Sequence, residues 1–230
     1  MKYKTELHCH SAEVSDCAKA DAETIVRCYV AAGYTSVVLS NHLSKFTYKN
    51  KRFDHSALPW DEKIDYFMAG YHKLCRAAEG KLHIILGCEL RSNQNDNDYQ
   101  IYGITEEFLR AVPDMMDVKM SELSKKVREA GMLLYQCHPF RNGMRVTDPA
   151  LLDGLEVYNG HIGQQSRNDI AYLWAEKFHL RMSSGSDFHQ EWHAIDGGIE
   201  TDFPITDTRV LLDTLKSGNY TLIRGDAVPY

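Results

Sequence analysis

In the stretch Thr35-Ser36-Val37-Val38-Leu39-Ser40-Asn41-His42, a short β-branched and apolar run stops at a polar pair. Two further runs follow the same plan: Leu82-His83-Ile84-Ile85-Leu86 precedes Gly87-Cys88-Glu89, and Met132-Leu133-Leu134-Tyr135-Gln136-Cys137 precedes His138-Pro139. Nearly continuous apolar runs are typical of parallel strands that are covered on both faces. Because the carboxyl ends of such strands meet at one edge, we expect the polar residues to gather there.

Amphipathic segments with a helical period separate these strand candidates. The segment 21–32 has apolar residues at Ile25, Val26, Tyr29 and Val30 and ends before Gly33, a residue suited to terminating a helix. Further helices are expected at 61–78, 121–130, 170–178 and 210–216, weaker strands at 3–7, 99–102, 155–158, 180–184 and 220–223, and loops at 45–60 and 92–98. The βαβα alternation predicts an α/β fold, with residues 1–230 as a single domain because no repeat or linker divides them.

Composition limits the classes of function. The chain has 230 residues, 43% of them hydrophobic, and a formal net charge of −6, which gives no basis for bulk attraction to nucleic acid or acidic membranes. No apolar run approaches the roughly 18 residues of a membrane span, and the polar start 1–6 does not resemble a signal peptide. The six cysteines are therefore expected to be reduced, and the protein cytoplasmic.

Histidines and acidic residues stand at the ends of the expected strands. His8 and His10 are two residues apart, so on a strand both side chains point to the same face. Asp187 and His189 repeat that spacing after a run of small residues. The other candidates are distant in sequence and need the fold to bring them together. A parallel barrel does so at the carboxyl ends of its strands, where a metal site is expected.

Taken together, these motifs resemble the PHP (polymerase and histidinol phosphatase) family. The resemblance covers about residues 5 to 190, and its motifs follow in order: Glu6-Leu7-His8-Cys9-His10-Ser11, Ser15-Asp16, Ser40-Asn41-His42, Gly87-Cys88-Glu89, His138-Pro139-Phe140, Glu156-Val157-Tyr158-Asn159 and Gly185-Ser186-Asp187-Phe188-His189. The resemblance implies a distorted (βα)7 TIM-like barrel that hydrolyses phosphoesters, with two or three divalent metal ions at the carboxyl ends of its strands.

The resemblance also implies a ligand set. One metal would be held by His8, His10, Glu89 and Asp187, a second by the bridging Glu89 with His138, and a third by Asp16, His42 and His189. Glu89, Asp187 and His138 would form the catalytic centre. This chain departs from the family at Asn41, where many members have Asp, and at Gln100, where many supply a further histidine. Because glutamine is a poor ligand for a borderline metal, the second metal is expected to be weakly held or absent.

The ligand set suits hydrolysis. It contains five imidazoles and three carboxylates but no cysteine, whereas structural zinc sites favour closed tetrahedral shells, frequently with thiolates. Mixed nitrogen and oxygen ligation fits zinc, manganese or iron. Three dications and three carboxylates together carry a net charge of about +3. This charge would attract an anionic substrate to the carboxyl ends of the strands, which form the mouth of the barrel. Metal-bound water with a lowered pKa can then attack phosphorus.

Several residues have two interpretations. Asp16 is either a metal ligand or the cap of the following helix, with Glu13 as its replacement in the ligand set. Arg141 is interpreted as a phosphate-binding residue or a plain surface residue, and Asn159 as a substrate contact or a turn residue. Cys9, Cys88 and Cys137 each adjoin a ligand and are expected to point away from it into the packing. His161 and His193 lie in expected mouth loops.

The leading hypothesis is a metal-dependent phosphatase that hydrolyses a small phosphomonoester by attack of metal-bound hydroxide. A close alternative is a phosphodiesterase or exonuclease acting on short nucleotides. Two rivals are a non-catalytic metal-binding module and a related hydrolase that acts on a non-phosphate substrate. The sequence leaves open the substrate, the native metal, the acid that protonates the leaving group, and the oligomeric state.

Overall fold

The computed structural model describes residues 2–49 and 53–225, and one sheet runs through it. The strands are β1 (Tyr3–Cys9), β2 (Tyr34–Leu39), β3 (His42–Leu43), β4 (His83–Arg91), β5 (Asp98–Tyr102), β6 (Leu133–Gln136), β7 (Gly154–Asn159), β8 (Arg181–Gly185), β9 (Ile199–Thr201) and β10 (Thr221–Leu222). The helices are α1 (Ala22–Ala31), α2 (Lys45–Tyr48), α3 (Trp60–Ala77), α4 (Glu106–Ala111), α5 (Met120–Glu129), α6 (Asn168–Lys177) and α7 (Thr208–Ser217), with 3₁₀ turns at Met115–Asp117 and Pro149–Leu151.

The sheet has the order β10-β9-β1-β2-β4-β5-β6-β7-β8, with β3 beside β4. It nearly closes into a barrel because the segment after β8 returns to β1. There Cys9 pairs with Phe188, and the backbone N–H of His10 donates to the carbonyl of Phe188 at 3.0 Å. Gly185 makes this approach possible, since a Cβ at that position would lie 2.3 Å from Cβ of His8. The expected TIM-like barrel is confirmed.

The strand directions differ from expectation in one respect. Most pairs are parallel, but β5 is antiparallel to both β4 and β6, and β9 is antiparallel to β1. A parallel pair needs a crossover of about a dozen residues or more, whereas only residues 92–97 connect β4 to β5. The reversal follows from that short connection, and it places the first residue of β5 at the end of the sheet where β4 finishes.

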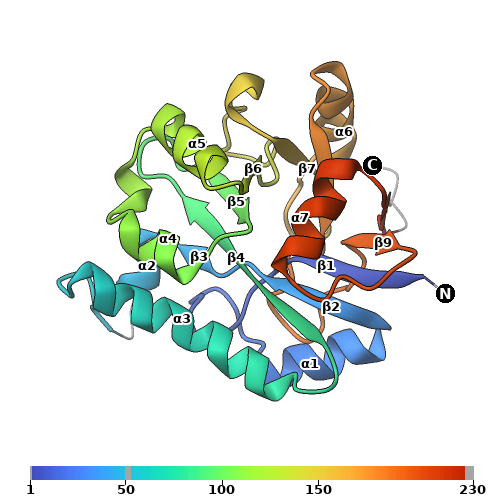
Figure 1. Cartoon of the computed structure of the whole chain (residues 1–230), viewed down its shortest axis with the longest axis horizontal. Coiled ribbons are helices and arrows are strands. Elements are labelled where there is room, and N and C mark those ends of the chain that lie inside the picture. The colour runs from blue at the N-terminus through green and yellow to red at the C-terminus, as the bar shows by residue number, and fades with distance from the viewer. Residues whose placement is uncertain (1, 50–52, 226–230) are drawn as a thin grey trace.

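Helices cover the outside of the barrel (Figure 1). The helices α1 and α3 pack against each other along one side, and α4, α5 and α6 follow around it (Figure 1). The expected helix 61–78 is α3, which runs unbroken through Gly70. A Cβ at Gly70 would lie 2.6 Å from the side chain of Val14, so this glycine serves close packing. The short elements α2, α4, β3 and β9 were not expected from the sequence.

One end of the barrel is closed by packing. Buried residues from β1, β2, β4, β5 and β6, among them Leu7, Tyr102 and Tyr135, form one cluster with Leu211 and Leu215 of α7. Fully burying such side chains stabilises the fold by about 1.5–3 kcal/mol each. The helix α7 therefore plugs this end, and polar side chains occupy the opposite end. Among the described residues no helix has the length and apolarity that a membrane crossing requires.

Candidate metal centre

The open end of the barrel brings together seven of the eight predicted metal ligands. His8 lies on β1, with His10 just beyond its end, His42 begins β3 and Glu89 lies on β4. His138 follows β6, while Asp187 and His189 follow β8. All are buried or half-buried. These distant segments therefore converge as predicted. The role of the seven residues as metal ligands stays a prediction.

Glu89 is at the centre of the group. Its Oε2 lies 2.9 Å from Nδ1 of His42, 3.2 Å from Nε2 of His10 and 3.4 Å from Nε2 of His8. Its Oε1 lies 3.1 Å from Nε2 of His138. One carboxylate thus faces four imidazoles from three segments of the chain. That arrangement is what a carboxylate bridging two cations requires.

The histidine pair of β1 has the spacing of two ligands on one ion. Nε2 of His8 and Nε2 of His10 are 3.1 Å apart, and Oδ1 of Asp187 lies 3.4 and 3.3 Å from them. Two donors at about 2.05 Å from a tetrahedral ion stand about 3.3 Å apart. These three atoms therefore fit a common cation with little movement, and His8, His10 and Asp187 also form one of the potential metal-holding groups.

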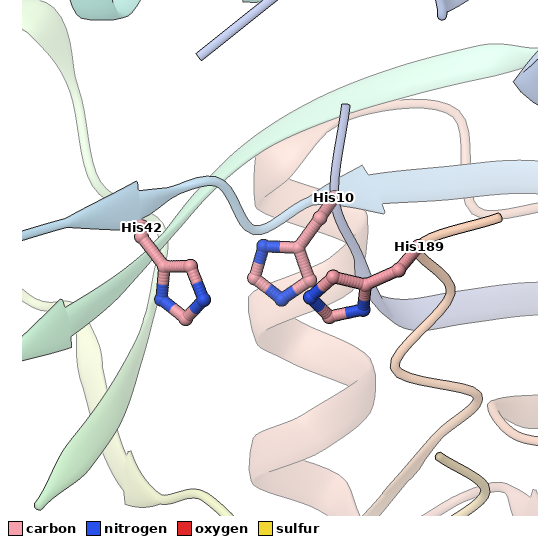
Figure 2. A group of neighbouring side chains, drawn as sticks. All are labelled: His10, His42 and His189. Carbon is pink, nitrogen blue, oxygen red and sulfur yellow. The ribbon is translucent and has the colours of Figure 1, made fainter. Parts of the chain in front are cut away.

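A second group consists of His10, His42 and His189, shown in Figure 2. The ring centroid of His10 lies 4.5 Å from that of His42 and 4.3 Å from that of His189. The three rings come from the ends of β1 and β8 and from β3, and they face one another across the mouth (Figure 2). This group contains His42 and His189 of the implied third-metal set, with His10 in the place of Asp16.

Hydrogen bonds behind the ligands fix the orientation of the rings. Nδ1 of His8 is 2.8 Å from Oε1 of Glu156, and Nδ1 of His189 is 2.8 Å from the carbonyl oxygen of Asp187. Because a carbonyl oxygen only accepts, Nδ1 of His189 carries the proton and Nε2 keeps its lone pair. Partners of this kind orient metal-binding imidazoles and raise their basicity.

Two of the predicted ligands have unusual backbone conformations. His138 has φ of 28° and Asp187 has φ of 50°, in the left-handed region that residues other than glycine rarely adopt. Such conformations cost about 1–3 kcal/mol and persist where surrounding contacts enforce them. At His138 one such contact is the hydrogen bond from its backbone N–H to Oε2 of Glu156 at 2.9 Å.

Charges in the centre stabilise one another. Burial opposes protonation of His8, but the carboxylates of Asp187 and Glu156 outweigh it and raise the pKa of His8 well above its usual value. Glu89 likewise outweighs burial at His42 and raises the pKa of that imidazole. Burial disfavours the carboxylate forms, yet the imidazoles hold the pKa values of Glu89 and Asp187 well below normal. A cation entering this centre would displace protons from His8 and His42.

The ligands open into a cavity of about 600 Å³. Its walls include Glu89, Asp187 and His189, with Phe46 and Lys49 from the α2 region and Gln164 from the loop after β7. A cavity of this size accommodates a small molecule. Part of the expected loop 45–60 thus lines the site through α2 and Lys49, while residues 50–52 lie outside the described part of the chain.

Arg141 reaches the cavity and contacts the centre. Its Nη2 donates to Oδ1 of Asn159 at 2.7 Å and to Oδ2 of Asp187 at 2.9 Å. Burial works against the guanidinium charge, but Asp187 outweighs this effect and raises the pKa of Arg141. The structure therefore places both predicted substrate-binding residues beside a predicted ligand. Asn159 is buried and also donates to Oε2 of Glu156 at 3.0 Å.

Asp16 stands apart from the other predicted ligands. It is exposed at the cavity wall and belongs to none of the potential metal-holding groups among the described residues. Asp16 does not cap the next helix either, since Oδ1 of Asp21 accepts from the backbone N–H of Thr24 and caps α1. Glu13 points away, with its Oε1 2.8 Å from Nζ of Lys73. Neither acid therefore completes the group of His10, His42 and His189.

Sequence reasoning missed Asp98. Its carboxylate is buried and forms a potential metal-holding group with His42 and Glu89, and it receives two hydrogen bonds from Arg91 at 2.7 and 2.5 Å. Gln100, at the family's second-metal position, is buried opposite Glu89 in the β4–β5 pair, and both of its amide atoms lack hydrogen-bond partners among the described residues. The antiparallel direction of β5 explains the difference, because it brings the start of that strand to the mouth.

The cysteines divide into two cases. Cys9 and Cys88 are packed in apolar clusters, as predicted. Cys137 is buried too, but its Sγ lies within 4.8 Å of ligand atoms of both His8 and Glu89, so it points toward the centre and not away from it. Side chains alternate between the two faces only within a strand, and Cys137 lies outside β6, which ends at Gln136.

The residues present fit divalent metals. Nitrogen and oxygen donors converge from five segments, and Oε2 of Glu89 is buried without a hydrogen bond of good geometry. Leaving such an oxygen unsatisfied costs about 1–3 kcal/mol, which coordination to a cation would recover. The donor types suit zinc, manganese or iron.

Comparison with known proteins adds information on the fold. No family model matches the chain, and no curated protein matches it in sequence. The structure is similar to a two-domain protein from Bacteroides vulgatus that contains a predicted PHP-like metal-dependent phosphoesterase. The TM-score is 0.67 and the identity 14%, and the match covers 97% of this chain and 65% of that one.

Two further solved structures share the architecture. One is the lesion-specific endonuclease EndoQ from Pyrococcus furiosus, with a TM-score of 0.63, 12% identity, and coverage of 96% of this chain and 58% of that one. The other is an amidohydrolase from Chromobacterium violaceum with bound sulfate and no metal, with a TM-score of 0.57, 14% identity, and coverage of 98% and 100%. The present chain has the barrel fold of PHP-like metal-dependent phosphoesterases.

Proposed function

We propose that this chain is a metal-dependent phosphoesterase that hydrolyses a small phosphomonoester. The observation that carries the proposal is Glu89, a buried carboxylate facing the imidazoles of His42, His10, His8 and His138 at 2.9–3.4 Å at the floor of an open cavity. A structural metal site is closed, whereas this arrangement leaves positions for water and substrate. The PHP-like protein from Bacteroides vulgatus supports the same assignment through its fold.

Two or three divalent ions would be held by His8, His10, His42, Glu89, His138, Asp187 and His189, with Asp98 as a further carboxylate ligand. When bound, they would supply a hydroxide nucleophile near neutral pH and neutralise charge on the phosphoryl oxygens.

The chain's own residues have separate tasks in this proposal. Arg141 presents a planar guanidinium to the cavity and would hold two phosphoryl oxygens, with Asn159 fixing its direction through the 2.7 Å hydrogen bond. Glu156 keeps the proton of His8 on Nδ1, so that Nε2 stays available. The cavity of about 600 Å³ limits the substrate to a small molecule or the end of a short chain.

A second candidate activity is phosphodiester hydrolysis on short nucleotides. Phe46 lines the cavity and is 54% exposed, so its ring is free on one side to stack on a base. One structure with this fold is an endonuclease. The net charge of −6 opposes binding of long polymers, which limits this candidate to short substrates.

The experiment compares substrate classes on metal-free protein to which zinc, manganese or iron is returned. We expect hydrolysis of phosphomonoesters, its loss with chelator and with His10→Ala, and little change with His72→Ala, an exposed histidine far from the centre. A preference for phosphodiesters would favour the second candidate. Hydrolysis of amides alone would support the amidohydrolase alternative, and a stable protein inactive with every metal would support a non-catalytic module.

Arg141 separates phosphate recognition from metal loading. Arg141→Ala should lower kcat/KM about 10- to 100-fold, because one charge-assisted contact contributes about 1.5–3 kcal/mol. Arg145→Ala removes a nearby exposed guanidinium and is the matched control. Equal activity of the two variants would contradict the assigned role of Arg141.

A further inference from the structure

A group of three histidines lies beside the proposed metal centre. It consists of His161 in the loop after β7, His189 after β8, and His193 four residues further on. The ring of His161 is 5.1 Å from both other rings, which are 6.1 Å from each other. One ligand nitrogen of each residue lies within 4.8 Å of the other two. We refer to these three residues as the imidazole triad.

The triad is held in place by the surrounding chain. The backbone N–H of His161 donates to Oδ1 of Asn159 at 3.1 Å, and that of His193 donates to the carbonyl of Gln190 at 2.9 Å. The ring of Trp192 covers His193 with a centroid distance of 4.5 Å, and only 7% of His193 is exposed. These contacts restrict the rings to the neighbourhood of one another, so a ligand would find them already assembled.

Two ring nitrogens of the triad lack strong internal partners. Nδ1 of His161 is buried and has no hydrogen-bond partner among the described residues. Nδ1 of His193 accepts from the backbone of His189 at 3.4 Å, which is long for a hydrogen bond between nitrogens. A buried nitrogen without a partner costs free energy that a bound cation would recover.

The donor chemistry differs from that of the main centre. The triad itself contains imidazoles only, whereas Glu89 and Asp187 give the main centre carboxylate oxygens. Neutral imidazoles favour zinc, copper, nickel and cobalt over manganese or magnesium. These ligand nitrogens already lie within 4.8 Å of one another, and separations of about 3.3 Å would give a tetrahedral zinc site with one position left for water.

His189 belongs to both groups. It joins His10 and His42 in the main centre and His161 and His193 in the triad. Its Nδ1 donates to the carbonyl of Asp187, so Nε2 is the one nitrogen left to bind a metal. A cation on the triad therefore competes with a cation on His10 and His42 for the same atom.

We infer that His161, His189 and His193 form an additional zinc-binding site, whose occupation withdraws His189 from the neighbouring metal centre. Zinc in excess would then act as an inhibitor of an enzyme working with another metal. This inhibitory consequence rests on the proposed function, whereas zinc binding to the triad does not.

The binding test counts zinc without using activity. The full-length His10→Ala/His42→Ala variant removes the competing group and keeps the triad intact. Stripped of metal and equilibrated with zinc, it should bind one zinc more per chain than the same variant carrying His161→Ala and His193→Ala. His72→Ala and His83→Ala, both exposed, are the matched substitutions and should leave the count unchanged. Circular dichroism confirms that each variant is folded.

Equal zinc counts with and without His161 and His193 would overturn the site. An equal loss in the His72→Ala/His83→Ala control would also overturn it, because the loss would then follow from removing any pair of histidines. A difference in zinc count in a protein that hydrolyses no phosphoester would leave the site standing while the proposed function fails.

The competition has its own readout. Two manganese-loaded proteins are compared, both with unaltered His10 and His42: the unaltered chain and the His161→Ala/His193→Ala variant. For each, the zinc concentration that halves its own zinc-free rate is measured. The His161→Ala/His193→Ala variant should require at least 10-fold more zinc. An unchanged zinc sensitivity would refute the competition for His189.

Discussion

Glu156 and His8 are 148 residues apart in the sequence, yet Oε1 of Glu156 accepts a hydrogen bond from Nδ1 of His8 at 2.8 Å. Both side chains are buried, and the other oxygen of Glu156 accepts from the backbone N–H of His138 at 2.9 Å. A single carboxylate thus contacts the ring of one predicted ligand and the backbone of another, from distant parts of the chain. The predicted ligands therefore depend on a residue that would touch no metal itself.

The first prediction follows from that relationship. Glu156→Ala should weaken metal binding about 10- to 100-fold, which is the usual effect of losing such a supporting carboxylate. Equilibrium dialysis against zinc or manganese measures the affinity, and Glu129→Ala, an exposed acid on α5, is the control. A folded Glu156→Ala variant with unchanged affinity would show that His8 needs no support.

The second prediction concerns Asp98. Its buried carboxylate shares a potential metal group with His42 and Glu89. Asp98→Asn should weaken binding of one metal by about 10-fold or more, because a neutral amide replaces a charged ligand in a site where even indirect support contributes that much. Asp96→Asn, two residues earlier and exposed, should have no effect. The number of metals and their affinities are read by titration, and equal curves for the two variants would exclude Asp98 as a ligand.

The third prediction compares two buried glutamines. Gln100 has no hydrogen-bond partner for either amide atom among the described residues, whereas Gln136 donates to the carbonyl of Arg145 at 2.8 Å and accepts from the backbone of Thr147 at 2.9 Å. Gln100→Met should raise the free energy of unfolding by about 1 kcal/mol, and Gln136→Met should lower it by about 2 kcal/mol. Denaturant unfolding measures both. A loss of stability in Gln100→Met would reveal a partner such as a bound water.

The fourth prediction is a pH effect on the metal-free protein. Burial, with help from His161 and His189, lowers the pKa of His193 from 6.5 to about 4. Between these values the unfolded chain binds the proton and the folded chain does not, so stability falls as pH drops from 6.5 to 4. The shift corresponds to at most about 3 kcal/mol, which partial solvation reduces to about 2 kcal/mol.

His193→Gln removes this titration and provides the comparison. Its unfolding free energy should decline less than that of the unaltered chain over the same pH range, by up to about 2 kcal/mol at the acid end. Parallel pH profiles for the two proteins would show that His193 titrates normally in the folded state.

The apolar runs and helix periods predicted alternating strands and helices, and the resemblance to the PHP family implied their closure into a barrel. The predicted segments 35–40, 82–86 and 132–137 correspond to β2, β4 and β6, and their polar ends converge as expected. Gly33 and Gly131, both with positive φ, follow the helices that were expected to end there. Local patterns were sufficient at these places because packing and propensity agree.

Two features could not be read with the same rule. The rule that ligands stand at the carboxyl ends of strands does not find Asp98, because β5 enters the mouth at its beginning. The available signal was the length of the connection, since residues 92–97 are too few for a crossover. Asp16 was placed by its motif, and its exposure depends on the course of a loop that no periodicity describes.

The reversal of β5 has a consequence for how this chain tolerates change. Surface connections generally accept extra residues at small cost. The connection 92–97 differs, because Glu89 lies just before it and Asp98 directly after it, so its length sets the distance between two donors. The connection is also held in place by a hydrogen bond, in which Oδ1 of Asn97 accepts from the backbone N–H of Arg145 at 2.8 Å. A single inserted glycine here should therefore damage the chemistry of the mouth, while leaving the barrel itself standing.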